Sequence, residues 1–203
     1  IGGNGFAAIL KNGGNKTVLF RADMDALPIK EETGISFESV KTTKQNGMDV
    51  PIMHACGHDI HMTSLIGTAE YFSKNKDSWK GTIVFILQPA EEIGFGARQM
   101  INAGLFKKIP YPDINLALHV SAQTQSGTVH ITPGFAMANV DSVDVTFYGE
   151  GGHGAYPHLT KDPIVMSSQF IISVQTIISR NLSPINAGVV TVGTIHGGTK
   201  HNI

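Results

Sequence analysis

The residue types best suited to chemistry cluster at 53–59, M-H-A-C-G-H-D, which holds the only cysteine of the chain and two of its nine histidines. Thiolate, imidazole and carboxylate groups are the ligands of borderline-soft divalent metals such as zinc. Gly57 permits a tight turn, so that Cys56 and His58 can converge on one point. An inert buried cysteine beside a helix cap is the alternative, but the clustering of ligand types favours a metal site.

The segment after this cluster predicts a helix over 60–72. Its apolar residues recur on one face, namely Met62, Leu65, Ile66, Ala69 and Phe72. Cys56 would then lie just before a helix N-terminus, where the helix dipole favours a thiolate over a thiol.

Three further groups of candidate ligands each follow an apolar segment that predicts a strand. They are Asp23 and Asp25 after 17–22, Glu91 and Glu92 after 82–87, and His119 after 113–118. In an open parallel sheet the carboxyl ends of the strands share one edge, so these groups would meet beside the Cys56/His58 turn. Segment 82–87 is apolar without alternation, as in a central strand covered on both faces.

Each acidic group also has a structural alternative. Asp23 and Asp25 could form a solvated turn before Pro28, and the two glutamates could begin a helix, where negative charge is favoured. Adjacent residues of an extended segment point in opposite directions. We therefore expect one of Glu91 and Glu92 to reach a metal while the other faces a bound water or substrate.

The elements predict an α/β fold with a mostly parallel sheet and helices on both faces, plus part of a smaller α+β domain. Residues 12–15, N-G-G-N, predict a hairpin turn between strands at 6–10 and 17–22. The composition changes near Phe135, and no acidic residue follows Asp162. We place a domain boundary near Ala138, giving domains 1–137 and 138–203. The second would contain a strand over 140–148, a helix that begins at Asp162–Pro163, and a strand over 187–195.

Size and charge exclude several classes of protein. The chain has 203 residues and a formal net charge of −1, so neither a nucleic-acid nor a membrane partner is indicated. No apolar run approaches the about 20 residues of a membrane span, and no signal peptide is visible, so we expect a cytoplasmic protein. Because it starts with Ile1 and stops at Ile203, we expect a piece of a longer protein.

Residues 149–154, G-E-G-G-H-G, fit the G-x-G-x-x-G dinucleotide pattern after a strand. Pro157 and Pro163 delay the helix that should follow at once, and no acidic residue stands where a ribose would be held. We therefore interpret this segment as a loop that presents His153, with His158 nearby.

Five motifs in order give the chain a resemblance to a known family. They are R-A-D-M-D-A-L-P at 21–28, M-H-A-C-G-H-D at 53–59, Q-P-A-E-E at 88–92, L-H-V at 118–120 and G-G-H-G-A-Y-P-H-L-T-K-D-P at 151–163. The chain resembles the aminoacylase/carboxypeptidase family of metal-dependent hydrolases. Within it, the chain is similar to the amidohydrolase branch that includes hippurate hydrolases, N-acetyldiaminopimelate deacetylases and auxin-conjugate hydrolases.

The resemblance implies two divalent metal ions, and it assigns residue roles. A thiolate ligand favours zinc, manganese, cobalt or nickel over magnesium. The implied metal ligands are Cys56, His58, Glu92 and His119. Glu91 would be the general base, and Asp25 would orient a ligand. His153 would belong to a lid domain and polarise the scissile carbonyl at the partner subunit's site, and Asn202 would contact substrate. Relatives outside this branch carry His-x-Asp at 23–25, so Asp23 receives no ligand role.

By the same resemblance, residues 1–137 would be the N-terminal part of a catalytic metal-binding domain, and residues 138–203 part of a lid or dimerisation domain. The implied activity is hydrolysis of the amide bond of small N-acyl amino acids, in a homodimer formed through the lid domain. The family's chains are longer, and one further histidine ligand is implied in the part not matched here. Two alternatives remain. One is a metallo-dipeptidase or carboxypeptidase acting on small peptides, and the other is an inactive metal-binding or dimerisation fragment.

Overall fold

The computed structural model describes residues 1–203, which form two compact units, Ile1–Ile131 and Thr132–Ile203. The predicted boundary at 137/138 lies a few residues after this division. The assignment of the two parts as catalytic and lid domains stays a prediction. None of the helices combines the length and the apolar character needed to cross a membrane.

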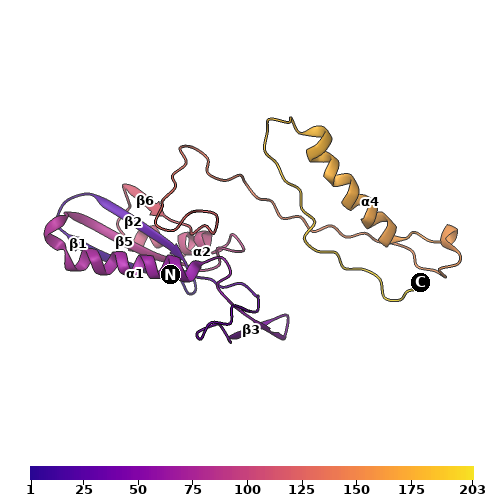
Figure 1. Ribbon diagram of the computed structural model, residues 1–203, viewed down its shortest axis with the longest axis horizontal. Coiled ribbons are helices and arrows are strands. Elements are labelled where there is room, and N and C mark those ends of the chain that lie inside the picture. The colour runs from indigo at the N-terminus through magenta and orange to yellow at the C-terminus, as the bar shows by residue number, and fades with distance from the viewer. The chain divides into compact units, whose positions relative to one another are not determined.

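The first unit is built on a four-stranded sheet with the strand order β1-β5-β2-β6 (Figure 1). The strands are β1 (Phe6–Asn12), β2 (Thr17–Asp23), β5 (Gly81–Gln88) and β6 (Ile114–Ala117). β2 runs parallel to both β5 and β6, whereas β1 runs antiparallel to β5. The predicted mostly parallel sheet is confirmed. The predicted hairpin is wrong, because β5 lies between β1 and β2.

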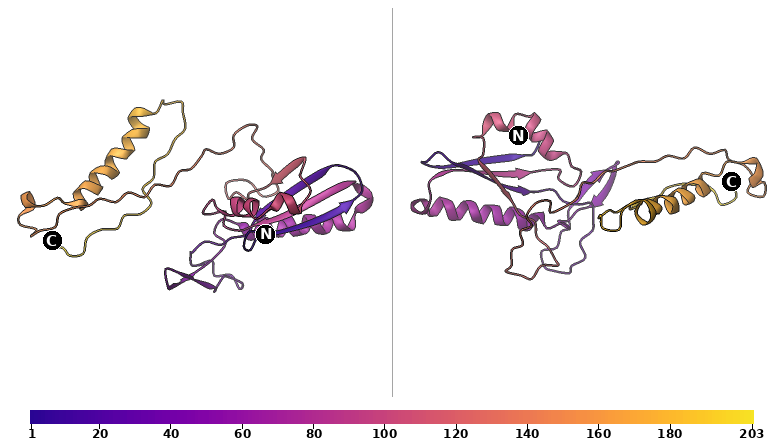
Figure 2. Two further views of the ribbon diagram at one scale, coloured as in Figure 1. Left: turned by 180° about the vertical axis from the view of Figure 1, so that it is seen from behind. Right: turned by 90° about the horizontal axis from the view of Figure 1, so that it is seen from above.

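Helices cover both faces of this sheet (Figure 2). α1 (His58–Lys74) packs on one face, and α2 (Gly96–Asn102) and α3 (Leu105–Lys108) pack on the other. The core under α1 contains Ala22, Leu65, Ile83 and Phe85, and the opposite core contains Leu19, Val84, Ile86, Met100, Leu105 and Ile109. Because successive residues of β5 enter opposite cores, β5 is the central strand that its unbroken apolar sequence predicts.

The buried face of α1 differs from the predicted one at its N-terminal end. Leu65 is buried, and Ala69 and Phe72 pack against the same core, as predicted. Ile66 is 63% exposed, whereas His58 and His61 are buried. The first turn of α1 therefore places polar imidazoles in the interior.

Short elements complete the first unit. A hairpin of β3 (Thr42–Gln45) and β4 (Met48–Pro51) precedes the Cys/His segment, and a 3-10 turn, η1 (Lys76–Ser78), follows α1. An antiparallel bridge between Leu27 and Met53 ties the segment after β2 to the segment before α1. The two segments that carry Asp25 and Cys56 are thus held together.

The second unit contains helices but no paired strands. Its elements are η2 (Pro157–Leu159), α4 (Pro163–Thr176) and a π-helical turn, η3 (Ile177–Asn181). Asp162 Oδ1 accepts the backbone N–H groups of Ile164 and Val165 at 2.8 and 3.2 Å, which confirms the predicted N-cap. The strands predicted over 140–148 and 187–195 are not formed. Neither segment finds a backbone partner, and their apolar side chains stay exposed, as at Val143 (78%) and Val189 (85%).

Candidate metal centre

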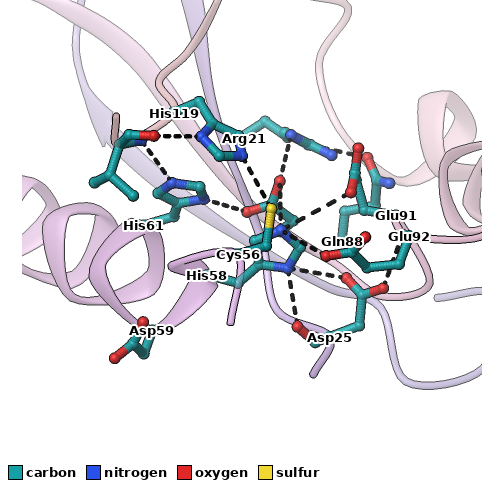
Figure 3. A network of polar contacts seen from close by, with 12 residues as sticks. Arg21, Asp25, Cys56, His58, Asp59, His61, Gln88, Glu91, Glu92 and His119 are labelled. Carbon is teal, nitrogen blue, oxygen red and sulfur yellow. Dashed lines mark hydrogen bonds and ion pairs between the residues drawn. The ribbon is translucent and has the colours of Figure 1, made fainter. Parts of the chain in front are cut away.

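Four segments of the first unit bring their polar side chains to the carboxyl edge of the sheet (Figure 3). Asp23 ends β2 and Asp25 follows it, Glu91 and Glu92 follow β5, His119 follows β6, Cys56 precedes α1, and His58 begins α1. The parallel arrangement thus gathers groups that are far apart in the sequence, as predicted. Asp59 is exposed and points away from this cluster.

Three sets of side chains have ligand atoms within 4.8 Å of one another. They are Cys56 with His58 and His119, His58 with Glu91 and Glu92, and Asp23 with His58 and His61. His58 belongs to all three sets. It is fully buried, with a relative exposure of 0%.

The protonation of His58 follows from its hydrogen bond. Its Nδ1 lies 2.9 Å from the backbone carbonyl oxygen of Asp25, and a carbonyl can only accept. Nδ1 therefore carries the proton, and Nε2 of a neutral ring has a free lone pair.

This Nε2 is buried without a hydrogen-bond partner, while one carboxylate oxygen each of Asp23, Glu91 and Glu92 lies 3.7–3.8 Å away. An unpaired buried nitrogen is costly. A cation among these oxygens would satisfy it, so the donor set fits a divalent metal.

The His119 ring is oriented like that of His58, with Nδ1 on a backbone carbonyl oxygen. Its Nδ1 lies 2.6 Å from the carbonyl oxygen of Val120, so Nδ1 donates and Nε2 keeps its lone pair. Nε2 lies 3.4 Å from the Cys56 sulfur. A hydrogen bond from the second ring nitrogen to a carbonyl is the usual way in which proteins orient a histidine ligand.

The surroundings of Cys56 oppose the effect that we predicted for the helix dipole. Burial raises the pKa of the Cys56 thiol above its usual value, and the nearby Glu92 carboxylate raises it further. Burial and negative charge thus outweigh the helix dipole. A bound cation would reverse the electrostatic balance and favour the thiolate that soft metals require.

Glu91 and Glu92 lie in a turn and not in the extended segment that we predicted. Ala90 adopts a left-handed conformation with φ of 52°, and the amides of Phe95 and Gly96 close the turn on its carbonyl oxygen. Both carboxylates consequently approach His58. Glu92 is held more firmly, because its backbone N–H donates to Asp25 Oδ2 at 3.0 Å, and its side chain is 24% exposed against 40% for Glu91.

Two further members of the cluster are buried: Asp23, which the sequence predicts as a candidate ligand, and His61, which it does not single out. Asp23 Oδ1 lies 2.5 Å from His61 Nδ1, and Asp23 Oδ2 lies 2.9 Å from Arg21 Nη1. Burial alone would raise the pKa of Asp23. The hydrogen bond from His61 and the positive charge of Arg21 outweigh this effect and lower the pKa. The spacing of His58 and His61 on one helical face was the available signal.

His153 and Asn202 belong to the second unit. The backbone N–H of Ala155 donates to His153 Nδ1 at 3.1 Å, and the N–H of Gly154 donates to the carbonyl oxygen of Asn202 at 2.9 Å. The unit thus brings the two segments with predicted substrate contacts side by side. Their roles at a metal centre stay predictions.

An α/β sheet that collects a thiol, imidazoles and carboxylates at its carboxyl edge is characteristic of metal-dependent hydrolases. The sequence profile of peptidase family M20/M25/M40 matches residues 19–194, and the chain belongs to this family. The predicted resemblance is therefore confirmed.

Relatives of known sequence and structure agree with this assignment. N-acetyldiaminopimelate deacetylases from Leuconostoc mesenteroides and Halalkalibacterium halodurans are 39% and 42% identical, over 93% and 94% of this chain and 47% and 48% of their own. The chain therefore spans about half the length of these relatives.

Two solved structures also match. A protein of methicillin-resistant Staphylococcus aureus classed as an aminohydrolase matches with a TM-score of 0.69 and 38% identity, over 98% of this chain and 50% of its own. A dinuclear metal-binding M20 peptidase from Bacillus subtilis gives a TM-score of 0.50 and 38% identity, over 59% and 31%.

Proposed function

We propose that the chain carries the core of a dinuclear metal centre that cleaves the amide bond of N-acyl amino acids. The observation that carries this proposal is the pair of imidazoles, His58 and His119, which both turn an unprotonated Nε2 into a cluster with Cys56 and two carboxylates. Two relatives bear the name N-acetyldiaminopimelate deacetylase, which suggests an acetylated diamino acid as the first substrate to test.

In this proposal Cys56, His58, Glu92 and His119 hold the metal ions. Divalent ions supply a Lewis acid for the amide carbonyl and make a water molecule acidic enough to attack near neutral pH. The thiol favours zinc, cobalt, nickel or manganese over magnesium as the bound metal. Asp25 positions two of the ligands, because it accepts from His58 through its carbonyl and from the Glu92 amide through its carboxylate.

Glu91 is the proposed general base. It is the more exposed of the two glutamates, and no hydrogen bond fixes its carboxylate. Its Oε2 lies 3.8 Å from His58 Nε2, which leaves it beside the ligands and open to water. Glu91 would accept a proton from the attacking water and return it to the departing amine nitrogen.

The experiment compares Glu91→Gln with Glu70→Gln after loading with zinc or manganese. Glu70 is an exposed acid on α1 that pairs with Lys74, so it serves as a matched control. We expect Glu91→Gln to keep the metal content and lose nearly all hydrolysis of N-acetyl amino acids, while Glu70→Gln behaves like the parent. Parental turnover in Glu91→Gln would refute the assigned role.

Two other candidate functions have specific support. The Bacillus subtilis neighbour is described as a peptidase, so dipeptides belong in the same substrate panel as N-acetyl and N-benzoyl amino acids. The ligand sets around His58 would equally suit a metal-binding module without turnover. Stoichiometric metal binding with no hydrolysis of any substrate in the panel would select that module.

The roles of the second unit are also part of the proposal. We propose that His153 and Asn202 contact the substrate carbonyl and that residues 138–203 form a homodimer. Apolar side chains are exposed in this unit, for example Ile172 at 71% and Leu159 at 72%. Light scattering of the purified chain measures the subunit number, and a monomer at micromolar concentration would contradict the dimer.

A further inference from the structure

The buried pair Asp23 and His61 has no task in the proposed reaction. Both side chains are 1% exposed, and they lie in the same cluster as His58. A metal-ligand role is the obvious reading for His61, but both of its ring nitrogens are already engaged. Nδ1 lies 2.5 Å from Asp23 Oδ1, and Nε2 lies 2.9 Å from the backbone nitrogen of Val120.

These two contacts fix the protonation of His61. A backbone N–H can only donate, so Nε2 accepts from Val120 and carries no proton. The proton of the neutral ring must then lie on Nδ1, where it is donated to Asp23 Oδ1. Asp23 Oδ1 is the acceptor of this hydrogen bond and so selects the tautomer.

Val120 links this pair to the metal centre. Its N–H donates to His61, and its carbonyl oxygen accepts from Nδ1 of His119 at 2.6 Å. The rings of His61 and His119 also contact edge to face, with centroids 4.6 Å apart. A displacement of the Val120 backbone would therefore turn the His119 ring and move its Nε2 away from Cys56.

On the side away from His119, Asp23 is held by residues of the sheet. Arg21 binds Asp23 Oδ2 through Nη1 at 2.9 Å and Gln88 Oε1 through Nε at 3.0 Å. Arg21 and Asp23 are both in β2, and Gln88 ends β5. His61 thus receives its orientation from the two central strands.

We propose that Asp23 and His61 form a positioning pair, which sets the direction of the His119 ligand through the backbone of Val120. The proposal rests on the metal centre of the proposed function. It adds one requirement for tight metal binding beyond the ligands themselves. A hydrogen-bond acceptor for the Val120 N–H must stand at the position of His61 Nε2. Residues outside the ligand shell typically change metal affinity by about 10–100-fold.

Two substitutions of His61 separate its two nitrogens. In His61→Gln the side-chain oxygen reaches the place of Nε2 and can still accept from Val120. In His61→Asn the shorter amide reaches only the place of Nδ1, so it can donate to Asp23 but leaves the Val120 N–H without a partner. Both variants keep a polar side chain of similar bulk at one buried site.

Metal affinity of the 203-residue chain is measured by competition between the protein and a chelator for Co²⁺. We expect His61→Gln to bind within about 3-fold of the parent and His61→Asn to bind about 10–100-fold more weakly. Fluorescence of Trp79, the only tryptophan, checks that each variant is folded. Equal affinity of His61→Asn and the parent would overturn the proposal, and so would equal weakening of two folded variants.

A second measurement needs no metal. Long-range ¹H–¹⁵N NMR of the metal-free chain reports the tautomer of each histidine, and we expect the proton of His61 on Nδ1. A proton on Nε2 would overturn the positioning pair whether or not metal binds. A parent chain that fails to bind Co²⁺ would instead refute the proposed function.

Discussion

Gly57 offers a direct perturbation of the candidate centre, because its backbone and its surroundings both exclude a side chain. Its φ is 79°, and a Cβ added there would lie 2.4 Å from Val120 Cγ2. The left-handed conformation costs a non-glycine residue about 1–2 kcal/mol, and overpacking costs about 1–3 kcal/mol. For Gly57→Ala we therefore expect a loss of about 2–5 kcal/mol in the free energy of unfolding.

Gly67→Ala is the matched control on the same helix. Gly67 lies within α1, and an added Cβ would meet nothing within 4 Å. Alanine in a helix interior is more stable than glycine by about 0.5–1 kcal/mol. The same chemical change at two sites of one element should therefore have opposite signs.

Urea titration followed by Trp79 fluorescence measures both changes. The Trp79 indole donates to the carbonyl oxygen of Phe72 at 2.9 Å, so it reports on the packing of α1. With a slope of about 2 kcal/mol per molar urea, Gly57→Ala should lower the midpoint by about 1–2.5 M. It should also weaken Co²⁺ binding, because Val120 must move. Parental stability and parental affinity in Gly57→Ala would refute this reasoning.

Two further predictions concern the turn after β5 and the start of β6. In Gly96→Ala the new Cβ would lie 1.5 Å from the Pro89 carbonyl oxygen, so the turn that carries both glutamates must shift. We expect the metal affinity of this variant to fall by about 10-fold or more. Ala90→Gly is the control, because glycine suits the φ of 52°, and it should bind metal like the parent. Asp113→Asn should destabilise the fold at neutral pH, because the Lys16 ammonium and the Thr17 amide hold the pKa of Asp113 below its usual value. The difference in the free energy of unfolding between Asp113→Asn and the parent should be fully present above the ordinary aspartate pKa of about 3.9. It should disappear as the pH falls through the lower pKa of Asp113 in the folded state. Urea titrations at pH 7 and pH 3 test this, and an equal difference at both would contradict it.

The parallel part of the sheet could be predicted from the sequence because its signals are local. β5 is a continuous apolar run, and polar side chains follow β2, β5 and β6 directly. The place of β1 could not be predicted, since N-G-G-N at 12–15 looks like a hairpin turn whether or not the flanking strands pair. Only the long-range registry of β1 with β5 decides between the two arrangements.

Most members of the cluster could also be predicted, but not their exact surroundings. His61 occupies a core position that an apolar residue normally takes, so a hydrophobic pattern points to its neighbours instead. The pKa of Cys56 depends on burial and on Glu92, which is distant in the sequence. The left-handed Ala90 that turns both glutamates toward His58 leaves no local signal, because alanine seldom adopts this conformation.

The central claim is that the Cys56 sulfur and the Nε2 atoms of His58 and His119 bind one cluster of divalent cations. Titration of the chain with Co²⁺ tests it directly, because thiolate bound to cobalt absorbs in the near ultraviolet. We predict an absorption band that saturates with added Co²⁺, disappears in Cys56→Ser and persists in Asp59→Asn, whose side chain points away from the cluster. No band in the parent, or an unchanged band in Cys56→Ser, would contradict the account.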